Sequence, residues 1–233
     1  MKGKLYLLPC PLGEDALHTI PAYVLDIIEK TSHFICERPK TARHFIKAAG
    51  VKRPLQEMKW YELSKRTEKR EWQTYLQAAE AGENIGLLSE AGCPGVADPG
   101  AEIVTLAHER NIEVVPMVGP SSILLAVMAS GMNGQNFAFN GYLAVKKPEL
   151  QRDLKRLEQE ARKKKQTQLF IETPYRNNTL AETVLQTLAP GTRFGIAVDL
   201  TLPTEQIIVK RVGDLKKGKL PDLHKRPAIF MIG

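Results

Sequence analysis

The first half of the chain alternates short apolar segments with segments of helical periodicity. The apolar segments are KLYLLP, HFIC, IGLLS and IEVVPMV. The helical patterns are PAYVLDIIEK, TARHFIKAAG, residues 67–81 and AEIVTLAHE. Strands that are apolar throughout are typical of a parallel sheet with helices on both faces, because side chains on either face are then buried. We therefore expect a parallel α/β sheet in this half.

The second half has a different pattern, with three apolar segments close together near its end. Helical patterns cover SSILLAVMASG, residues 148–165 and RNNTLAETVLQTL, and QLFIE is a predicted strand. RFGIAVDL, EQIIVKRV and PAIFMI are further predicted strands, the middle one forming a hairpin through GDLKKGKLPD. Antiparallel pairs then make this sheet mixed. The change of pattern near residues 116–120 predicts two α/β domains, residues 1–118 with a parallel sheet and residues 119–233 with a mixed one.

The composition argues against several kinds of protein. No apolar run approaches the roughly 18 residues of a membrane span, and the N-terminal MKGKLYLLPCPLGED lacks the cleavage pattern of a signal peptide. Cys10, Cys36 and Cys93 are widely spaced and odd in number, which favours reduced, buried thiols in the cytoplasm. The sequence has no P-loop, no dinucleotide fingerprint and no zinc-ligand spacing. We expect a cytoplasmic protein without membrane or metal.

The net charge of +7 is concentrated in two segments. Residues 146–165 contain nine Lys/Arg against four Asp/Glu, and residues 210–226 contain seven against two, so each segment has a net charge of +5. Concentrated basic segments are typical of surfaces that bind phosphate, as in RNA-binding proteins. A solvated helix face and a charged hairpin have the same composition, so charge alone leaves both interpretations open.

Loops rich in glycine, proline and serine follow four predicted strands of the first half. They are CPLGED, ERPK, EAGCPGVADPG and VGPSS. In open parallel sheets, ligands bind at the carboxyl ends of the strands. Glycine lets a ligand approach the backbone, and proline fixes the shape of a loop in advance. Each loop alone is explained by a tight turn, but four of them at one sheet edge predict a ligand site.

Four segments of the chain together resemble a known family. EAGCPGVADPG, VVPMVGPSS, FAFNGYL and LFIETPYR resemble the methyltransferases of the tetrapyrrole methylase superfamily, most closely the branch of ribosomal small-subunit RNA methyltransferase I. The resemblance covers nearly the whole chain and is most specific over residues 86–143. It implies two α/β domains with a cofactor cleft between them, a homodimer, S-adenosyl-L-methionine as cofactor and RNA as substrate.

The resemblance also implies which residues contact the cofactor. They come from the first, third and fourth loops of the first half, with two strand residues from the second half. The residues are Pro11, Leu12, Gly13, Gly92, Cys93, Val96, Ser121, Ser122, Ile171 and Ala197. For Ile171 and Ala197, ordinary strand core is the alternative. S-adenosyl-L-methionine carries no phosphate, so Gly92 and Gly95 are not expected to bind an anion. Because they lack side chains, they are expected to let the loop backbone lie directly against the cofactor.

The chain departs from the ribosomal branch on the side of the substrate. CPLGED stands where that branch has Thr-Pro-Ile-Gly-Asn-Leu, ERPK where it has Glu-Asp-Thr-Arg, and AVDLT where it has Arg-Glu-Leu-Thr. Two other functions therefore stay open. One is methylation of a tetrapyrrole or other small molecule, and the other is a non-catalytic RNA-binding or assembly factor.

Carboxylates near the predicted rim are the candidates for catalysis. If the acceptor is a ribose 2′-hydroxyl, a general base contributes about 10²- to 10⁴-fold to the rate. Glu172 is the first candidate, with Glu37 and Asp199 behind it. Asp98 is instead predicted to cap the following helix, with Pro99 in its first turn.

Three side chains are candidates for contact with the substrate. Tyr175 and Arg176 follow Glu172 in ETPYR, and Arg38 lies in ERPK. A guanidinium offers two parallel donors that fit a phosphate. Each arginine is explained equally well as a partner in a surface ion pair.

Overall fold

The structure is a computed structural model that describes residues 1–63, 67 and 69–233. Its elements fall into two units, Met1–Ser121 and Ser122–Gly233, each built on its own five-stranded sheet. This division lies beside the predicted boundary at residues 118–119, and the independence of the two domains stays a prediction. None of the helices in the described residues is long and apolar enough to cross a membrane.

The sheet of the first unit is parallel throughout, as predicted. Its strands are β1 (Lys4–Leu8), β2 (His33–Cys36), β3 (Lys59–Glu62), β4 (Ile85–Leu88) and β5 (Glu113–Pro116), in the order β3-β2-β4-β1-β5. Sequence analysis missed β3, because KWYE is a half-exposed edge strand without an apolar run. The strands β2 and β4 are buried at every position, which explains their uninterrupted apolar sequence.

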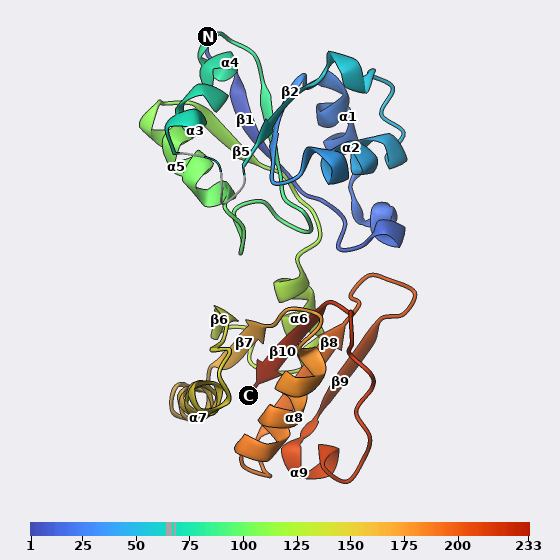
Figure 1. Ribbon diagram of the computed structural model, residues 1–233, viewed down its shortest axis with the longest axis vertical. Coiled ribbons are helices and arrows are strands. Elements are labelled where there is room, and N and C mark those ends of the chain that lie inside the picture. The colour runs from blue at the N-terminus through green and yellow to red at the C-terminus, as the bar shows by residue number, and fades with distance from the viewer. Residues whose placement is uncertain (64–66, 68) are drawn as a thin grey trace. The chain divides into compact units, whose positions relative to one another are not determined.

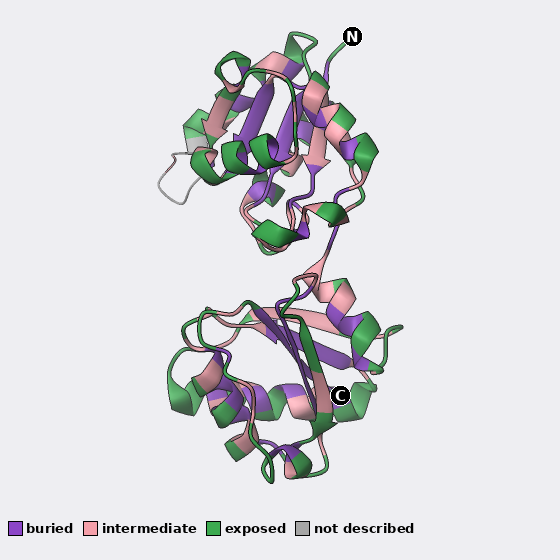
Figure 2. Ribbon diagram, turned by 90° about the vertical axis from the view of Figure 1, so that its right-hand side faces the viewer, coloured by how far each residue is buried: buried purple, intermediate pink, exposed green. Residues whose placement is uncertain are grey.

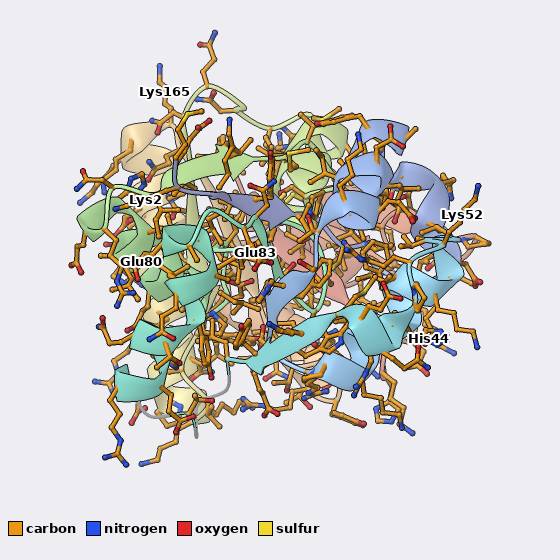
Figure 3. The ribbon with its side chains drawn as sticks, turned by 90° about the horizontal axis from the view of Figure 1, so that it is seen from above. Lys2, His44, Lys52, Glu80, Glu83 and Lys165 are labelled. Carbon is orange, nitrogen blue, oxygen red and sulfur yellow. The ribbon has the colours of Figure 1, made fainter. Side chains whose placement is uncertain are left out.

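Helices cover both faces of this sheet (Figure 1). They are η1 (Glu14–Thr19), α1 (Ala22–Lys30), α2 (Pro39–Ala48), η2 (Leu55–Glu57), α3 (Lys69–Tyr75), α4 (Gln77–Glu80) and α5 (Gly100–Glu109). Side chains of α1 and α2 pack against one face, and those of α3, α4 and α5 pack against the other. Accordingly, His44 on α2 and Glu80 on α4 lie on opposite sides of the sheet in the view from above (Figure 3).

The single helix predicted over residues 67–81 is wrong. The helical segment is interrupted at Leu76, whose φ of −93° and ψ of 1° are not helical, so α3 and α4 are separate. Residue 68 lies outside the described residues. Tyr75 and Leu76 are both buried in the same core cluster, so the apolar pattern continues across the break and does not reveal it.

The sheet of the second unit is mixed, as predicted. Its strands are β6 (Phe137–Tyr142), β7 (Thr167–Ile171), β8 (Arg193–Val198), β9 (Gln206–Arg211) and β10 (Ala228–Ile232), in the order β6-β7-β10-β8-β9. β6 and β7 are parallel, and the other pairs are antiparallel. Figure 2 shows buried strands in the middle of both sheets, whereas the edge strands β3, β5, β6 and β9 have no buried position.

The predicted hairpin through GDLKKGKLPD is wrong. β9 pairs with β8, while β10 lies between β7 and β8, and the start of the predicted turn forms the short helix α9 (Val212–Leu215). Burial explains the order. β10 is buried at all five positions and takes a central place, whereas β9 has exposed polar residues at both ends and lies at the edge.

Three longer helices complete the second unit (Figure 1). They are α6 (Ser122–Ser130), α7 (Lys147–Lys164) and α8 (Asn177–Thr187). α7 and α8 contribute to the main core, and α6 contacts β9 and β10. The buried residues of α7 are Leu150, Leu154, Leu157 and Ala161, a spacing that puts them on one helix face. The basic residues of α7 are therefore left on its solvent side.

Candidate functional site

The four predicted loops leave the first sheet at one edge, because β1, β2, β4 and β5 all run in the same direction. The first and third loops are joined directly. Cys10 N–H donates to the Gly92 carbonyl at 2.9 Å, and Gly92 N–H donates to the Cys10 carbonyl at 2.9 Å. This bridge fixes two of the predicted cofactor loops against each other.

Gly92 is the point at which three of the loops meet. Its φ is +72°, a conformation that glycine adopts readily. A Cβ at this position would lie 3.3 Å from Leu12 Cδ2 in the first loop and 3.4 Å from the Pro120 carbonyl oxygen in the fourth. Cys93 Sγ donates to the same carbonyl at 3.4 Å. The first and fourth loops therefore enclose Gly92 closely.

Asp98 holds the second half of the third loop. Its Oδ1 accepts hydrogen bonds from the N–H groups of Gly95 and Gly100, at 2.7 and 2.8 Å. α5 begins at Gly100, so its N-cap residue is Pro99 and not Asp98 as predicted, although the Asp98 side chain accepts from the first helical N–H; Pro99 also precedes the helix instead of lying in its first turn. Burial raises the pKa of Asp98, although the two N–H donors act in the opposite direction.

We expect Asp98→Ala to lower the free energy of unfolding by about 1–3 kcal/mol, because two N–H groups lose their acceptor. Asp98→Asn keeps the oxygen and serves as the matched control in urea unfolding. Since the folded chain holds the Asp98 proton more tightly than the unfolded chain, stability falls as pH rises from 3.8 toward the raised pKa. Asp98→Asn should remove that dependence. Equal stability of the Ala and Asn variants at every pH would contradict this role.

The remaining predicted residues of the first unit differ in exposure. Val96 is 49% exposed, whereas Pro11, Gly13 and Ser121 are half-buried. Arg38 is exposed, with Nη1 3.9 Å from Glu90 Oε2, so the second loop approaches the third. Glu37 is half-buried in the second loop.

The cysteines only partly match the expectation of buried thiols. All three are free, and Cys10 and Cys36 are buried, but Cys93 is partly exposed. Burial raises the pKa of Cys36 to about 12 and raises the pKa of Cys10 and Cys93 as well. The thiols are therefore protonated at neutral pH, and none has the lowered pKa of a reactive cysteine.

In the second unit, the predicted ETPYR cluster is present. Glu172 Oε2 lies 3.1 Å from Arg176 Nη2, and the same Nη2 donates to the Val145 carbonyl at 3.1 Å. The Glu172 side chain is only 8% exposed. Tyr175, by contrast, is 68% exposed. Glu172 and Arg176 thus form a sheltered ion pair beside an exposed aromatic ring.

The predicted strand residues Ile171 and Ala197 lie in one row of the second sheet. Both pair with Ile229, from the two sides of β10. Ala197 is buried at 1% exposure and Ile171 is half-buried. Ser122, the other predicted cofactor residue of this unit, is the half-buried first residue of α6.

Asp199 is held by partners from its own unit. Its Oδ2 accepts from Arg226 Nε at 2.7 Å and from Thr204 Oγ1 at 2.8 Å. Arg226 also donates to the carbonyls of Asp222 and Thr204. Sequence analysis missed Arg226, although it counted this residue within the basic segment 210–226. Asp199 has a φ of +51°, and its contacts stabilise the turn between β8 and β9.

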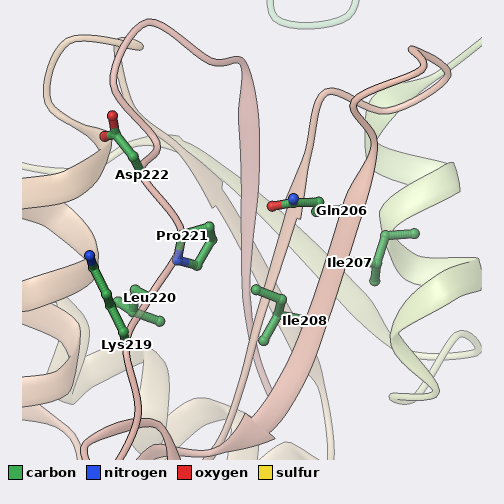
Figure 4. Close-up of a pocket in the computed structure, with 7 residues that line it drawn as sticks. All are labelled: Gln206, Ile207, Ile208, Lys219, Leu220, Pro221 and Asp222. Atoms are coloured by element: carbon green, nitrogen blue, oxygen red, sulfur yellow. The ribbon is translucent and has the colours of Figure 1, made fainter.

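A groove of about 700 Å³ lies between β9 and residues 219–222. Figure 4 shows Ile208 directed toward Leu220 and Pro221, and Lys219 lies on the same wall. None of its lining residues is a predicted site residue. Within the described part of the chain, no three His, Cys, Asp or Glu side chains are grouped as a metal site.

The chain matches the family model of the Tetrapyrrole (Corrin/Porphyrin) Methylases over residues 4–216. It belongs to this family of methyltransferases. The predicted resemblance is therefore confirmed. Solved structures of the family confirm the predicted fold. The methyltransferase CobJ superposes with a TM-score of 0.65 at 17% identity, covering 99% of this chain and 94% of that one. A uroporphyrin-III C-methyl transferase from Thermus thermophilus, complexed with S-adenyl homocysteine, has a TM-score of 0.59 at 16% identity, covering 99% and 97%.

Among curated relatives, this tetrapyrrole methylase is similar to proteins named ribosomal RNA small subunit methyltransferase I. The Escherichia coli O157:H7 protein is 28% identical over 225 residues, which are 97% of this chain and 75% of the relative. The Synechocystis protein is 33% identical over 180 residues, which are 75% of this chain and 58% of the relative.

Proposed function

We propose that this tetrapyrrole methylase transfers a methyl group from S-adenosyl-L-methionine to small-subunit ribosomal RNA, at a ribose 2′-hydroxyl. The observation that carries the proposal is the similarity to relatives named for ribosomal RNA methylation, which spans 97% of the chain in one of them. The loop junction at Gly92 supports a donor site on the first unit. Tetrapyrroles and other small molecules are the alternative acceptors.

The residues of the loop junction fit the methyl donor. Gly92 presents bare backbone at the point where a Cβ would fill the space beside Leu12 and Pro120. An uncharged junction of this kind suits a molecule without phosphate. When bound, S-adenosyl-L-methionine supplies a methyl group on a sulfonium that is already activated for displacement. The protein then contributes orientation, which is worth roughly 7–11 kcal/mol in well-aligned reactions.

We assign the donor contacts to the ten residues that the family resemblance implies. The first unit would supply Pro11, Leu12, Gly13, Gly92, Cys93, Val96 and Ser121. The second unit would supply Ser122, Ile171 and Ala197.

We assign removal of the proton from the acceptor hydroxyl to a carboxylate that acts as general base. Glu172 is the first candidate because it is sheltered and lies beside two predicted substrate residues, Tyr175 and Arg176. Its contact with Arg176 would have to open for it to take the proton. Glu37 and Asp199 are the other candidates, and Arg38 with Arg176 would contact RNA phosphates. The bonds from Arg226 and Thr204 give Asp199 a structural role as well.

The basic segments support RNA over a small acceptor. α7 keeps its apolar residues toward the core, which leaves its basic residues available on the solvent side. Binding of RNA through such residues weakens steeply as salt concentration rises. We also infer a cytoplasmic homodimer, supported by the exposed apolar side chains Met128 and Val145 and by three free cysteines.

Methyl transfer distinguishes these functions. The purified chain should transfer label from S-adenosyl-L-[methyl-³H]methionine to deproteinised small-subunit RNA and leave a bulk metabolite extract unlabelled. Nuclease digestion of the product then locates the methyl on ribose or base. Label in the metabolite fraction alone would reject RNA as acceptor. Failure to bind the donor in isothermal titration would reject both enzyme functions and leave an RNA-binding factor.

A further inference from the structure

Tyr175 is a large aromatic side chain left 68% exposed in the turn between β7 and α8. Two side chains from a distant segment flank its ring. The centroid of His224 lies 5.8 Å from that of Tyr175, with the rings at 72°, and Lys225 Nζ lies 6.0 Å from the Tyr175 centroid. A lysine ammonium at this distance is attracted to the ring, so Tyr175 and Lys225 together present an aromatic side chain and a positive charge at one exposed place.

The backbone around this ring is fixed from both sides. Lys225 N–H donates to the Pro174 carbonyl at 3.0 Å, which joins residues 222–226 to the turn that carries Tyr175. Asn177 Nδ2 donates to the Arg226 carbonyl at 2.6 Å. Asn178 accepts from Leu223 N–H at 2.8 Å and donates to Asp222 Oδ1 at 2.7 Å. Asp222, drawn in Figure 4, thus begins a segment that the start of α8 holds in place.

Lys225 itself adopts an unfavourable backbone conformation. Its φ is +60°, which a lysine rarely takes, and the bonds on either side of it maintain that geometry. Strain of this kind persists where surrounding contacts over-determine it and is concentrated at functional sites. The neighbouring Arg226 uses its guanidinium within the protein, on Asp199, Asp222 and Thr204. Lys225 Nζ, however, forms no ion pair with any residue the structure describes.

We propose that Tyr175 stacks on an unpaired RNA base, and that Lys225 and His224 bind the adjacent phosphate. The inference rests on the proposed function, and it adds that the second unit binds single-stranded RNA. An exposed ring beside a cation is an arrangement by which proteins hold unpaired nucleotides, because every base has a face on which an aromatic side chain can stack. Bases within a duplex are already stacked and are not available to such a ring.

The test is a titration of a fluorescein-labelled, single-stranded RNA oligonucleotide of about ten nucleotides against the full chain, followed by anisotropy without the methyl donor. Tyr175→Ala should raise Kd about ten- to a hundredfold, the range found for loss of one stacked base. Tyr175→Phe should restore binding to within about twofold, because the ring is kept. Tyr142→Ala is the matched control, since Tyr142 is 63% exposed in the same unit.

The salt dependence of Kd distinguishes the contribution of charge from that of stacking. Lys225→Ala should reduce the slope of log Kd against log salt by about one, whereas Tyr175→Ala should leave the slope unchanged. Wild-type binding by Tyr175→Ala would overturn the inference. So would a Tyr175→Phe variant as weak as Tyr175→Ala, or an equal loss on duplex RNA. Circular dichroism of each variant confirms that the fold is kept.

The same samples separate this inference from the proposed function. Tyr175-dependent binding by a wild-type chain that methylates no RNA would support stacking and reject the proposed function. If the chain methylates small-subunit RNA but its affinity for the oligonucleotide does not change in Tyr175→Ala, the proposed function stands and stacking is rejected.

Discussion

Gly92→Val should abolish binding of S-adenosyl-L-methionine. At a φ of +72°, a side chain costs roughly 1–2 kcal/mol relative to glycine, and a β-branched residue is especially disfavoured there. The new Cβ would lie 3.3 Å from Leu12 Cδ2 and 3.4 Å from the Pro120 carbonyl oxygen, before its two methyl groups are placed. Those groups would push apart the three loops proposed to hold the donor.

Isothermal titration measures this loss, and Gly50→Val provides the matched control. Gly50 has a φ of +75° but no atom within 4 Å of its Cβ position. Gly50→Val should therefore add a similar backbone strain, without the steric contacts, while keeping donor affinity. If Gly92→Val does not fold, Gly92→Ala adds the same backbone strain without the extra methyl groups. Wild-type affinity in Gly92→Ala and Gly92→Val would contradict the proposed site.

Arg226→Ala should strongly lower the free energy of unfolding of the second unit. Removing one partner of a buried ion pair costs roughly 3–5 kcal/mol, because the other charge stays buried without compensation. Asp199 keeps only 8% of its side chain exposed, but Arg226 keeps 24%, so we expect a loss near the lower end, about 3 kcal/mol. The turn between β8 and β9 also loses the bond from Arg226 to Thr204.

A double-mutant cycle in urea isolates the pair. Asp199→Asn removes the charge but keeps an oxygen acceptor, and asparagine tolerates the φ of +51° at this position. In the Asp199→Asn background, Arg226→Ala should therefore cost much less than in wild type. Additive losses would show that the pair contributes little. Methyl transfer by the stable Asp199→Asn variant also tests catalysis: full activity would leave Asp199 with a structural role.

The parallel sheet could be predicted because β2 and β4 are buried at every position, so their sequences are continuously apolar. The strand order in the second unit could not be predicted, because it depends on which strands pair across long separations in the sequence. The segment GDLKKGKLPD resembled a hairpin turn, yet β9 and β10 both pair with β8 and not with each other. A local pattern describes one segment, whereas pairing is decided by the burial of whole strands.

In the candidate site, too, features set by neighbouring residues could be predicted, whereas contacts between distant segments could not. The loop at Gly92 could be identified from its glycines and prolines, because glycine widens and proline restricts the local choice of backbone conformation. Glu172 and Arg176 could be grouped from their spacing, since they are four residues apart. The partners of Asp199 and Tyr175 could not be found in this way. Arg226 is 27 residues from Asp199, and Lys225 is 50 residues from Tyr175, beside which it is held by hydrogen bonds to Pro174 and from Asn177.

The central position of β10 has a consequence for biosynthesis. The ribosome makes β7, β8 and β9 before β10, yet β7 and β8 are neighbours of β10 and not of each other. Until Ala228–Ile232 emerges, the nascent chain holds two strands with an open edge each, and non-local pairing of this kind is slow. Exposed strand edges favour aggregation. The first sheet has the same arrangement, since β4 pairs with β1 and β2, which are made before it, so each unit holds open strand edges during synthesis until its central strand emerges.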